Sequence, residues 1–122
     1  MNFNPGEKGE SAGEEMTLQD IKTLLESTGL PVTYRAWPNQ QAPTLPWICY
    51  LVTGSNNFFA DGKMYLAVST ISVELYTALI SPALEQQLEQ ALQDFCWQKT
   101  ITYIDAEKVY QITYEIEVQI DA

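Results

Sequence analysis

Residues 109–120, with the sequence VYQITYEIEVQI, alternate between apolar and polar side chains along their whole length. Successive side chains of an extended strand point in opposite directions, so the apolar residues fall on one side and Gln, Thr and Glu on the other. The segment therefore predicts a strand in a sheet that has one buried face and one polar face. Residues 70–76, TISVELY, show the same alternation and predict a second strand of this kind.

A first helix is predicted to begin after Thr17. The sequence TLQD, residues 17–20, has the pattern of a capping box, with Thr17 as the N-cap and Asp20 in place of the more usual Glu. Gly29 suits the left-handed backbone that follows a helix, and Pro31 prevents the helix from continuing. The apolar residues between these signals have helical spacing: Leu18, Ile21, Leu24 and Leu25.

A second helix is predicted to begin at Pro82, because Ser81 is a favourable N-cap and proline is favoured at the first helical position. Glutamate and glutamine fill one face of this helix and are expected to face solvent. The apolar stripe on the other face consists of Leu84, Leu88, Ala91, Leu92 and Phe95.

The remaining strands are predicted at residues 32–37, 47–53 and 100–104, and a long strand is expected from Met64 to about Thr77. The predicted order is α-β-β-β-α-β-β. This order indicates an α+β fold: a two-layer sandwich with a mostly antiparallel sheet and two helices on one face. Residues 1–15, MNFNPGEKGESAGEE, have almost nothing to bury and are expected to be a disordered acidic N-terminal tail, which leaves residues 16–122 as a single α+β domain.

The charge balance restricts the partners. The chain has 6 basic and 16 acidic residues and a net charge of −10, so phosphate backbones are repelled and specific nucleic-acid binding is not expected. No apolar run approaches the roughly 20 residues that a membrane helix needs, and the N-terminus lacks the apolar segment of a signal peptide. A soluble, cytoplasmic protein without a membrane partner is expected.

The residues needed for catalysis are scarce. The chain has no histidine and 2 cysteines, and it contains no phosphate-binding, zinc-protease or CxxC motif. Cys49 and Cys96 are expected to be small buried thiols, and Glu115 and Glu117 are interpreted as part of an exposed polar strand face. We therefore expect no catalytic residues, no cofactor and no metal, and the chain is not predicted to be an enzyme.

Aromatic residues provide the main indication of a binding surface. Trp47 and Trp97 flank strands and are expected in the core, whereas Trp37 lies in a Pro-rich loop and could contact a partner. In GSNNFFADGKMY, residues 54–65, either one of two adjacent phenylalanines points to the core and the other to an interface, or both pack locally. Asp-Gly in the same segment predicts a turn. The candidate protein-interface residues are Asn56, Asn57, Phe58, Phe59, Asp61, Lys63 and Trp37.

Several segments carry a resemblance to a known family: TLLESTGLPVTYRAW, PWICYLVTGSNNFFADGKMYL, ISVELYT, PALEQQLEQAL and YIDAEKVYQITYEIEV. In their content and order they resemble short proteins encoded among the structural genes of tailed bacteriophages and prophages of Gram-positive bacteria. The likeness runs from about Met16 to Val118. It is a likeness to tail-completion proteins, which are tail terminators or head-tail joining proteins.

The resemblance implies a small α+β subunit that assembles as a homo-oligomeric ring, typically a hexamer, on the finished tail tube. The implied partners are the tail tube and the head connector, and DNA passes through the ring. The implied location is the host bacterial cytoplasm during assembly and then the neck or tail of the virion. Within such a ring, the tip at residues 55–63 is expected to reach a neighbouring subunit or the tube, and acidic residues are expected to line the channel. The alternative is a stand-alone phage-encoded interaction module that binds a host protein as a monomer or dimer.

Overall fold

The computed structural model describes residues 16–60, 62–66 and 68–120, and for residues 58–60 and 63–66 it describes the backbone alone. The predicted disordered tail, residues 1–15, lies outside the described residues. The elements, in chain order, are α1 (Leu18–Glu26), β1 (Val32–Tyr34), the 3₁₀ turn η1 (Pro38–Gln40), β2 (Trp47–Ser55), β3 (Phe58–Ala60), β4 (Lys63–Leu66), β5 (Ser69–Thr77), α2 (Pro82–Ala91), β6 (Gln98–Ile104) and β7 (Val109–Val118).

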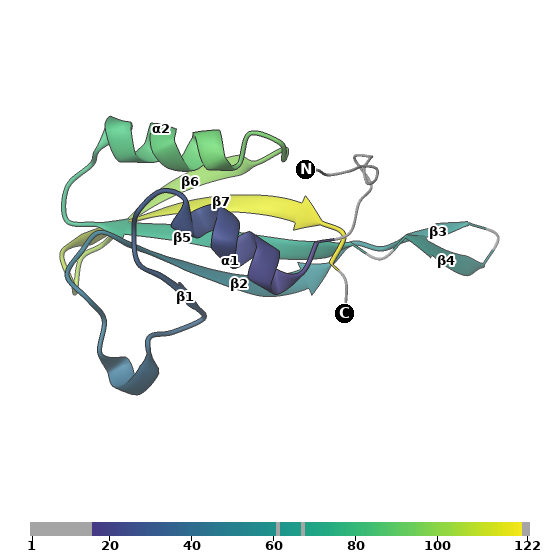
Figure 1. The fold of residues 1–122 in the computed structure, drawn as a ribbon, viewed down its shortest axis with the longest axis horizontal. Coiled ribbons are helices and arrows are strands. Elements are labelled where there is room, and N and C mark those ends of the chain that lie inside the picture. Colours follow the sequence, from purple (N-terminus) through teal and green to yellow (C-terminus); the bar gives the residue numbers. More distant parts are fainter. Residues whose placement is uncertain (1–15, 61, 67, 121–122) are drawn as a thin grey trace.

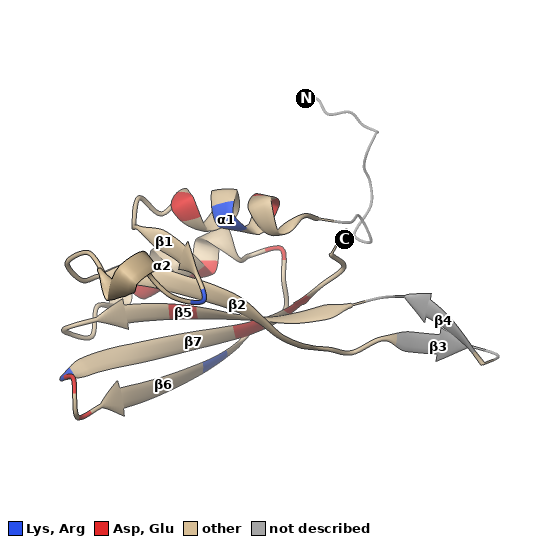
Figure 2. Ribbon diagram, turned by 90° about the horizontal axis from the view of Figure 1, so that it is seen from below, with Lys and Arg blue, Asp and Glu red and all other residues tan. Residues whose placement is uncertain are grey.

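The main sheet has five strands in the order β1-β2-β5-β7-β6. Strand β1 runs parallel to β2, and every other neighbouring pair is antiparallel. Both helices lie on the same face of this sheet (Figures 1 and 2). The structure therefore has the predicted α+β architecture, and its helices and main-sheet strands follow the predicted order. No helix among the described residues is long and apolar enough to cross a membrane.

The predicted alternation of buried apolar and exposed polar side chains is present in β7. Ile112, Tyr114 and Ile116 are almost completely buried under the helices, whereas Glu115 and Glu117 on the opposite face are exposed. Strand β5 contributes Ile71, Val73 and Leu75 in the same way, and Ile21, Leu25, Leu88 and Leu92 complete the core from the helices. Hydrophobic burial of this continuous layer holds the two layers together.

The predicted helix starts are also present. Thr17 Oγ1 accepts a 3.0 Å hydrogen bond from the Asp20 amide, and Asp20 Oδ2 accepts one of 3.0 Å from the Thr17 amide. Ser81 caps α2 through a 3.4 Å bond from the Leu84 amide. Gly29 has φ +85°, a left-handed conformation that glycine adopts without steric cost, and it directs the chain from α1 toward β1.

The long strand expected from Met64 to Thr77 is instead two strands, β4 and β5. Pairing of β5 with β2 ends at Ser55↔Ser69. Beyond this pair, the Val68 carbonyl accepts from the Asn56 amide, and the Val68 amide donates to the side chain of Asn57. Because an asparagine side chain takes the place of a backbone partner, the ladder does not continue in register, and the chain leaves the main sheet.

Candidate interaction surface

The described residues between 56 and 68 form a projecting hairpin, which we call the arm. Its strands β3 and β4 pair antiparallel and make a two-stranded sheet that is separate from the main one. Gly62 has φ +76°, so the turn forms where the Asp-Gly dipeptide predicts it. Figure 1 shows the arm extending past the end of the main sheet, beyond β2 and β5.

Hydrogen bonds fasten the base of the arm to the main sheet. The Asn56 amide donates to the Val68 carbonyl at 3.0 Å, and the Val68 amide donates to Asn57 Oδ1 at 3.0 Å. The side-chain amide of Asn56 also donates to Glu117 Oε2 on β7 at 2.9 Å. Of the predicted interface residues, Asn56 and Asn57 therefore hold the arm in place.

The other predicted residues of the segment occupy the arm itself. Phe58, Phe59 and Lys63 lie on β3 and β4, where the backbone alone is described, and Asp61 lies outside the described residues. The two alternatives for the phenylalanine rings therefore stay predictions. What the structure adds is their place, on a hairpin that shares no strand pairing with the main sheet.

Trp37 lies far from the arm. Its ring meets that of Trp47 edge-on, with centroids 5.6 Å apart and planes at 87°. Trp47 begins β2 and the arm follows the end of β2, a strand of 9 residues, which is about 30 Å long at roughly 3.3 Å per residue. The structure therefore does not bring Trp37 and residues 56–63 into one contiguous site.

The prediction that Trp47 belongs to the core is wrong. Ile48 and Tyr50 on β2 face the helices, so Trp47 faces the opposite side of the sheet, where its ring lies 4.5 Å from that of Tyr76. Trp97 does pack against the core, with its ring 5.3 Å from that of Tyr114. A tryptophan at the end of a strand can cover either face of the sheet, and its position in the alternation of side chains along the strand decides which face it covers.

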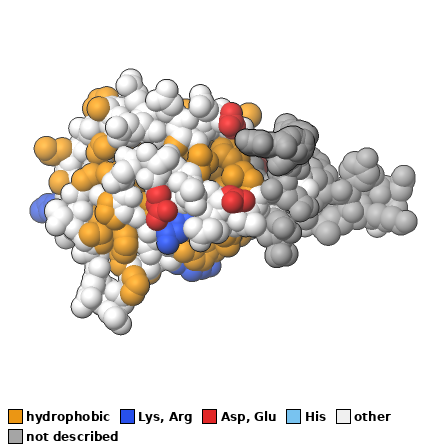
Figure 3. All heavy atoms as spheres, viewed as in Figure 1, with side chains coloured by type: hydrophobic (Ala, Val, Ile, Leu, Met, Phe, Trp, Pro, Cys, Tyr) orange, Lys and Arg blue, Asp and Glu red, His pale blue; other side chains and the backbone are white. Residues whose placement is uncertain are grey.

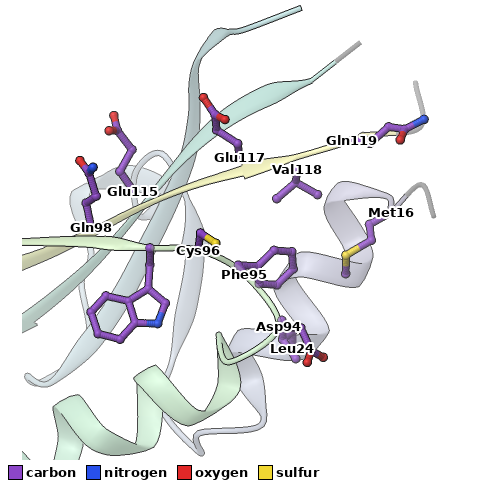
Figure 4. Close-up of a pocket in the computed structure, with 11 residues that line it drawn as sticks. Met16, Leu24, Asp94, Phe95, Cys96, Gln98, Glu115, Glu117, Val118 and Gln119 are labelled. Carbon is purple, nitrogen blue, oxygen red and sulfur yellow. The ribbon is translucent and has the colours of Figure 1, made fainter. Parts of the chain in front are cut away.

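A cavity of about 1000 Å³ opens beside the base of the arm. It lies where β6 begins: the pairing of β6 with β7 starts at Gln98↔Glu115, and β7 continues beyond this pair to Val118. Its apolar lining comes from Met16, Leu24, Phe95, Trp97 and Val118, and its acidic lining comes from Asp94, Glu115 and Glu117. In Figure 4, Val118 points toward Phe95, whereas Glu115 and Glu117 point away from both.

Glu117 connects the cavity to the arm, because it lines the cavity and also binds Asn56. The arm and the cavity therefore adjoin at one end of the sheet. Cys96 also lines this cavity and is exposed, so the expectation that both thiols are buried is wrong for Cys96. It lies in the connection between α2 and β6, where the periodicity of the helix no longer applies.

The sequence analysis missed a polar cluster beneath α2. Lys99 Nζ bonds Glu85 Oε1 at 2.9 Å and Glu89 Oε2 at 2.7 Å, and the Tyr114 hydroxyl donates to Glu89 Oε2 at 2.8 Å. Glu85 is only 7% exposed, so the prediction that the α2 glutamates all face solvent is wrong for this residue. The local sequence indicates the burial of Glu85 only by its helical spacing with the apolar stripe. Its partner Lys99 is 14 residues away and gives no local signal.

The electrostatics of this cluster are those of an ion pair. Burial alone would raise the pKa of Glu89, but hydrogen bonds from Lys99 and Tyr114 lower it below its usual value. The pKa of Lys99 is raised by its hydrogen bonds to Glu89 and Glu85. The pKa of Tyr114 is raised by burial and by its bond to Glu89. Each group is held in its usual charge state, which suits a structural tie better than proton transfer.

Within the residues that the structure describes, no three Cys, Asp or Glu side chains are grouped so that they could hold a metal ion. The main candidate surface is the arm with the adjoining cavity. At the opposite end of the sheet, exposed apolar side chains reach the surface (Figure 3); these include Leu79, Ile80 and Tyr103. No protein-family model and no curated protein matches this chain.

Proposed function

We propose that the chain is a structural subunit of a phage or prophage tail-completion ring, a tail terminator or head-tail joining protein. The observation that carries the proposal is the arm: a hairpin with its own two-stranded sheet, fastened at its base and projecting from the end of the main sheet. A ring subunit must reach a neighbour without disturbing its own core, and such a hairpin can do so.

The chemistry of a hairpin supports this role. Its strands can offer backbone hydrogen bonds to a neighbouring sheet, which is a common mode of protein recognition. Phe58 and Phe59 stand on one of these strands, and aromatic residues contribute strongly to interfaces. We infer that the arm contacts a neighbouring subunit or the tail tube.

The charge of the chain supports a position around DNA. The net charge is −10, and Glu115 and Glu117 are exposed on the sheet face opposite the helices. Like charge repels the phosphate backbone, so DNA passes a channel lined by such a face without binding to it. The resemblance to tail-completion proteins supports the same assignment.

The test replaces both phenylalanines of the arm by serine. Phe58→Ser/Phe59→Ser should abolish attachment to tail tubes and ring formation on them, while the circular dichroism of the subunit stays unchanged. The matched control is Leu79→Ser/Ile80→Ser, which removes an exposed apolar pair from the other end of the body and should leave assembly intact. Tail tubes are included because a subunit of this kind can remain monomeric until a tube templates the ring.

Two outcomes would count against the proposal. Unchanged tube binding by the serine variant would exclude the arm from assembly. The alternative of a stand-alone interaction module would be favoured if the wild-type chain did not bind tail tubes and instead formed a stable one-to-one complex with a host protein. The position of the gene provides an independent check, since a tail-completion gene is expected between the connector and tail-tube genes.

A further inference from the structure

Strand β6 is an open edge of the main sheet. It is the last strand in the order β1-β2-β5-β7-β6, and among the described residues it pairs with β7 alone. Six of its 7 residues are exposed, and only Ile104 is partly buried. Its outer side therefore presents unpaired backbone groups to any strand that approaches.

This edge has little of the usual protection against pairing. Protected edges carry proline, a bulge or charged side chains, especially lysine. The residues of β6, QKTITYI, include no proline, and its register with β7 is continuous from Gln98 to Ile104. Its one charge, Lys99, is already bound to Glu85 and Glu89. An edge of this composition is suited to pairing.

The two faces of β6 differ in character. Lys99, Ile101 and Tyr103 lie opposite Tyr114, Ile112 and Tyr110 of β7 and share their helix-bearing face. On this face, Ile101 is 50% exposed and Tyr103 is 45% exposed. Thr100 and Thr102 lie on the other face. A strand added alongside β6 would remove the exposed isoleucine and tyrosine from water, which favours pairing.

The geometry points to a second copy of this chain as the occupant: we propose that β6 pairs antiparallel with β6 of another copy about a two-fold axis at Ile101. Ile101 is the midpoint of the strand Gln98–Ile104. With the axis there, Ile101 faces Ile101, Thr100 faces Thr102, and Lys99 faces Tyr103. The first two are an aliphatic pair and a threonine pair, which are favourable across strands. In the third, the aliphatic stem of Lys99 packs beside the Tyr103 ring while its Nζ stays bound to Glu85 and Glu89.

The alternative registers are poorer. Moving the axis to Thr100 or Thr102 keeps each residue on its own face but leaves two residues of β6 unpaired in each copy. Only the register centred on Ile101 pairs the whole strand. It also keeps the two Lys99 side chains four positions apart, about 13 Å along the strands. The strand is thus complementary to itself, which is the reason for choosing a second copy over an unrelated partner.

The pairing would join two main sheets edge to edge and leave both arms free, because the arm extends from the end of the sheet (Figure 1). A two-fold contact of this kind closes on itself and cannot build a ring. The dimer is therefore a separate association that goes beyond the proposed function, and its success or failure does not depend on tail tubes.

The first experiment is disulfide cross-linking in a Cys96→Ser background, which removes the exposed thiol and leaves the buried Cys49. Ile101→Cys should form a disulfide-linked dimer under mild oxidation, since directly opposed strand residues bring their Cβ atoms to about 5 Å. A mixture of Thr100→Cys and Thr102→Cys should form a heterodimer. Thr53→Cys, an exposed residue on β2, is the control and should cross-link at least tenfold more slowly.

The second experiment measures the dimer by sedimentation without cross-linking. Ile101→Lys places two like charges at the axis and should raise the dimer dissociation constant at least tenfold, whereas Ile101→Val should change it little. A wild-type chain that stays monomeric at 100 µM protein, together with an Ile101→Cys rate equal to that of the control, would overturn the proposal. So would a dimer that Ile101→Lys leaves unchanged, because its contact would then lie elsewhere.

Discussion

The side-chain amide of Asn56 donates a 2.9 Å hydrogen bond to Glu117 Oε2, joining two residues 61 positions apart. Asn56 lies where the chain leaves β2 for the arm, and Glu117 lies near the end of β7. Together with the bonds between Val68 and the two asparagines, this contact fastens the arm to the main sheet, and it also reaches the lining of the cavity.

Asn56→Ala should loosen the arm without unfolding the domain. One exposed hydrogen bond to a carboxylate is lost, so the free energy of unfolding should fall by about 1 kcal/mol. Amide hydrogen exchange at residues 58–66 should become faster, while exchange in β5 and β7 stays the same. Glu117→Gln is the control, because its side-chain carbonyl can still accept from Asn56. Equal exchange rates in the wild type and both variants would show that the hydrogen bond between Asn56 and Glu117 does not hold the arm.

Lys99→Met should destabilise the domain by about 1–3 kcal/mol. The substitution leaves Glu85, only 7% exposed, without its cation, and an unpaired buried charge is costly. The expected loss is below that of a fully buried pair, because the Lys99 side chain is 30% exposed. Urea unfolding measures the change. Lys108→Met, an exposed lysine in the turn between β6 and β7, should have little effect.

The same cluster predicts a dependence of stability on pH. The pKa of Glu89 is lower in the folded protein than in the unfolded chain, so the unfolded chain binds more protons at acid pH. The stability that Glu89 contributes is present above the ordinary glutamate pKa and is lost as the pH falls from about 5. The unfolding free energy of Lys99→Met should fall less steeply over this range. If the unfolding free energies of the wild type and Lys99→Met fall equally with pH, the ion pair between Lys99 and Glu89 is not the cause of this dependence.

The two thiols should differ sharply in reactivity. Burial, followed by the nearby charge of Glu74, raises the pKa of Cys49 to about 11, and its Sγ donates to the Arg35 carbonyl at 3.0 Å. Cys96 is exposed. At pH 8, an aromatic disulfide reagent should label one thiol rapidly and the second only after unfolding, since the thiolate is the reactive form. Cys96→Ser should abolish the rapid phase; a rapid phase that survives would place the reactive thiol at Cys49.

Thr17→Ala should cost about 1 kcal/mol of stability, because it removes one half of the capping box at the start of α1. Thr23→Ala on the same helix is the matched control. Thr23 is exposed in the helix interior, where alanine is the better helix former, so this change should be neutral or slightly stabilising. Urea unfolding of the two variants side by side measures the difference. A similar loss in both would show that threonine is not acting through the cap.

Local signals explain what the sequence predicted correctly. Thr17 with Asp20, and Ser81 with Pro82, satisfy the first amides of their helices with residues only a few positions away. The alternation in β7 reports burial on one face whatever its neighbours are. These features need no knowledge of distant parts of the chain, so the α+β order could be inferred.

The features that the sequence could not predict depend on distant partners. Glu85 is buried because Lys99 lies beneath it, and Trp47 covers the open face because it meets Trp37 and Tyr76. The long strand divides near Val68 because Asn56 and Asn57, in the connection between β2 and β3, bind its backbone. The cavity exists because β6 is shorter than β7, and strand lengths relative to each other emerge only from the assembled sheet.

The separate pairing of β3 with β4 has a practical consequence. Backbone bonds within the hairpin are made between its own two strands, so lengthening both strands equally, or grafting an epitope into the turn at Gly62, changes no register in the main sheet. The arm is thus the segment where new sequence can be introduced at the least cost to folding, and where related chains have the most freedom to diverge.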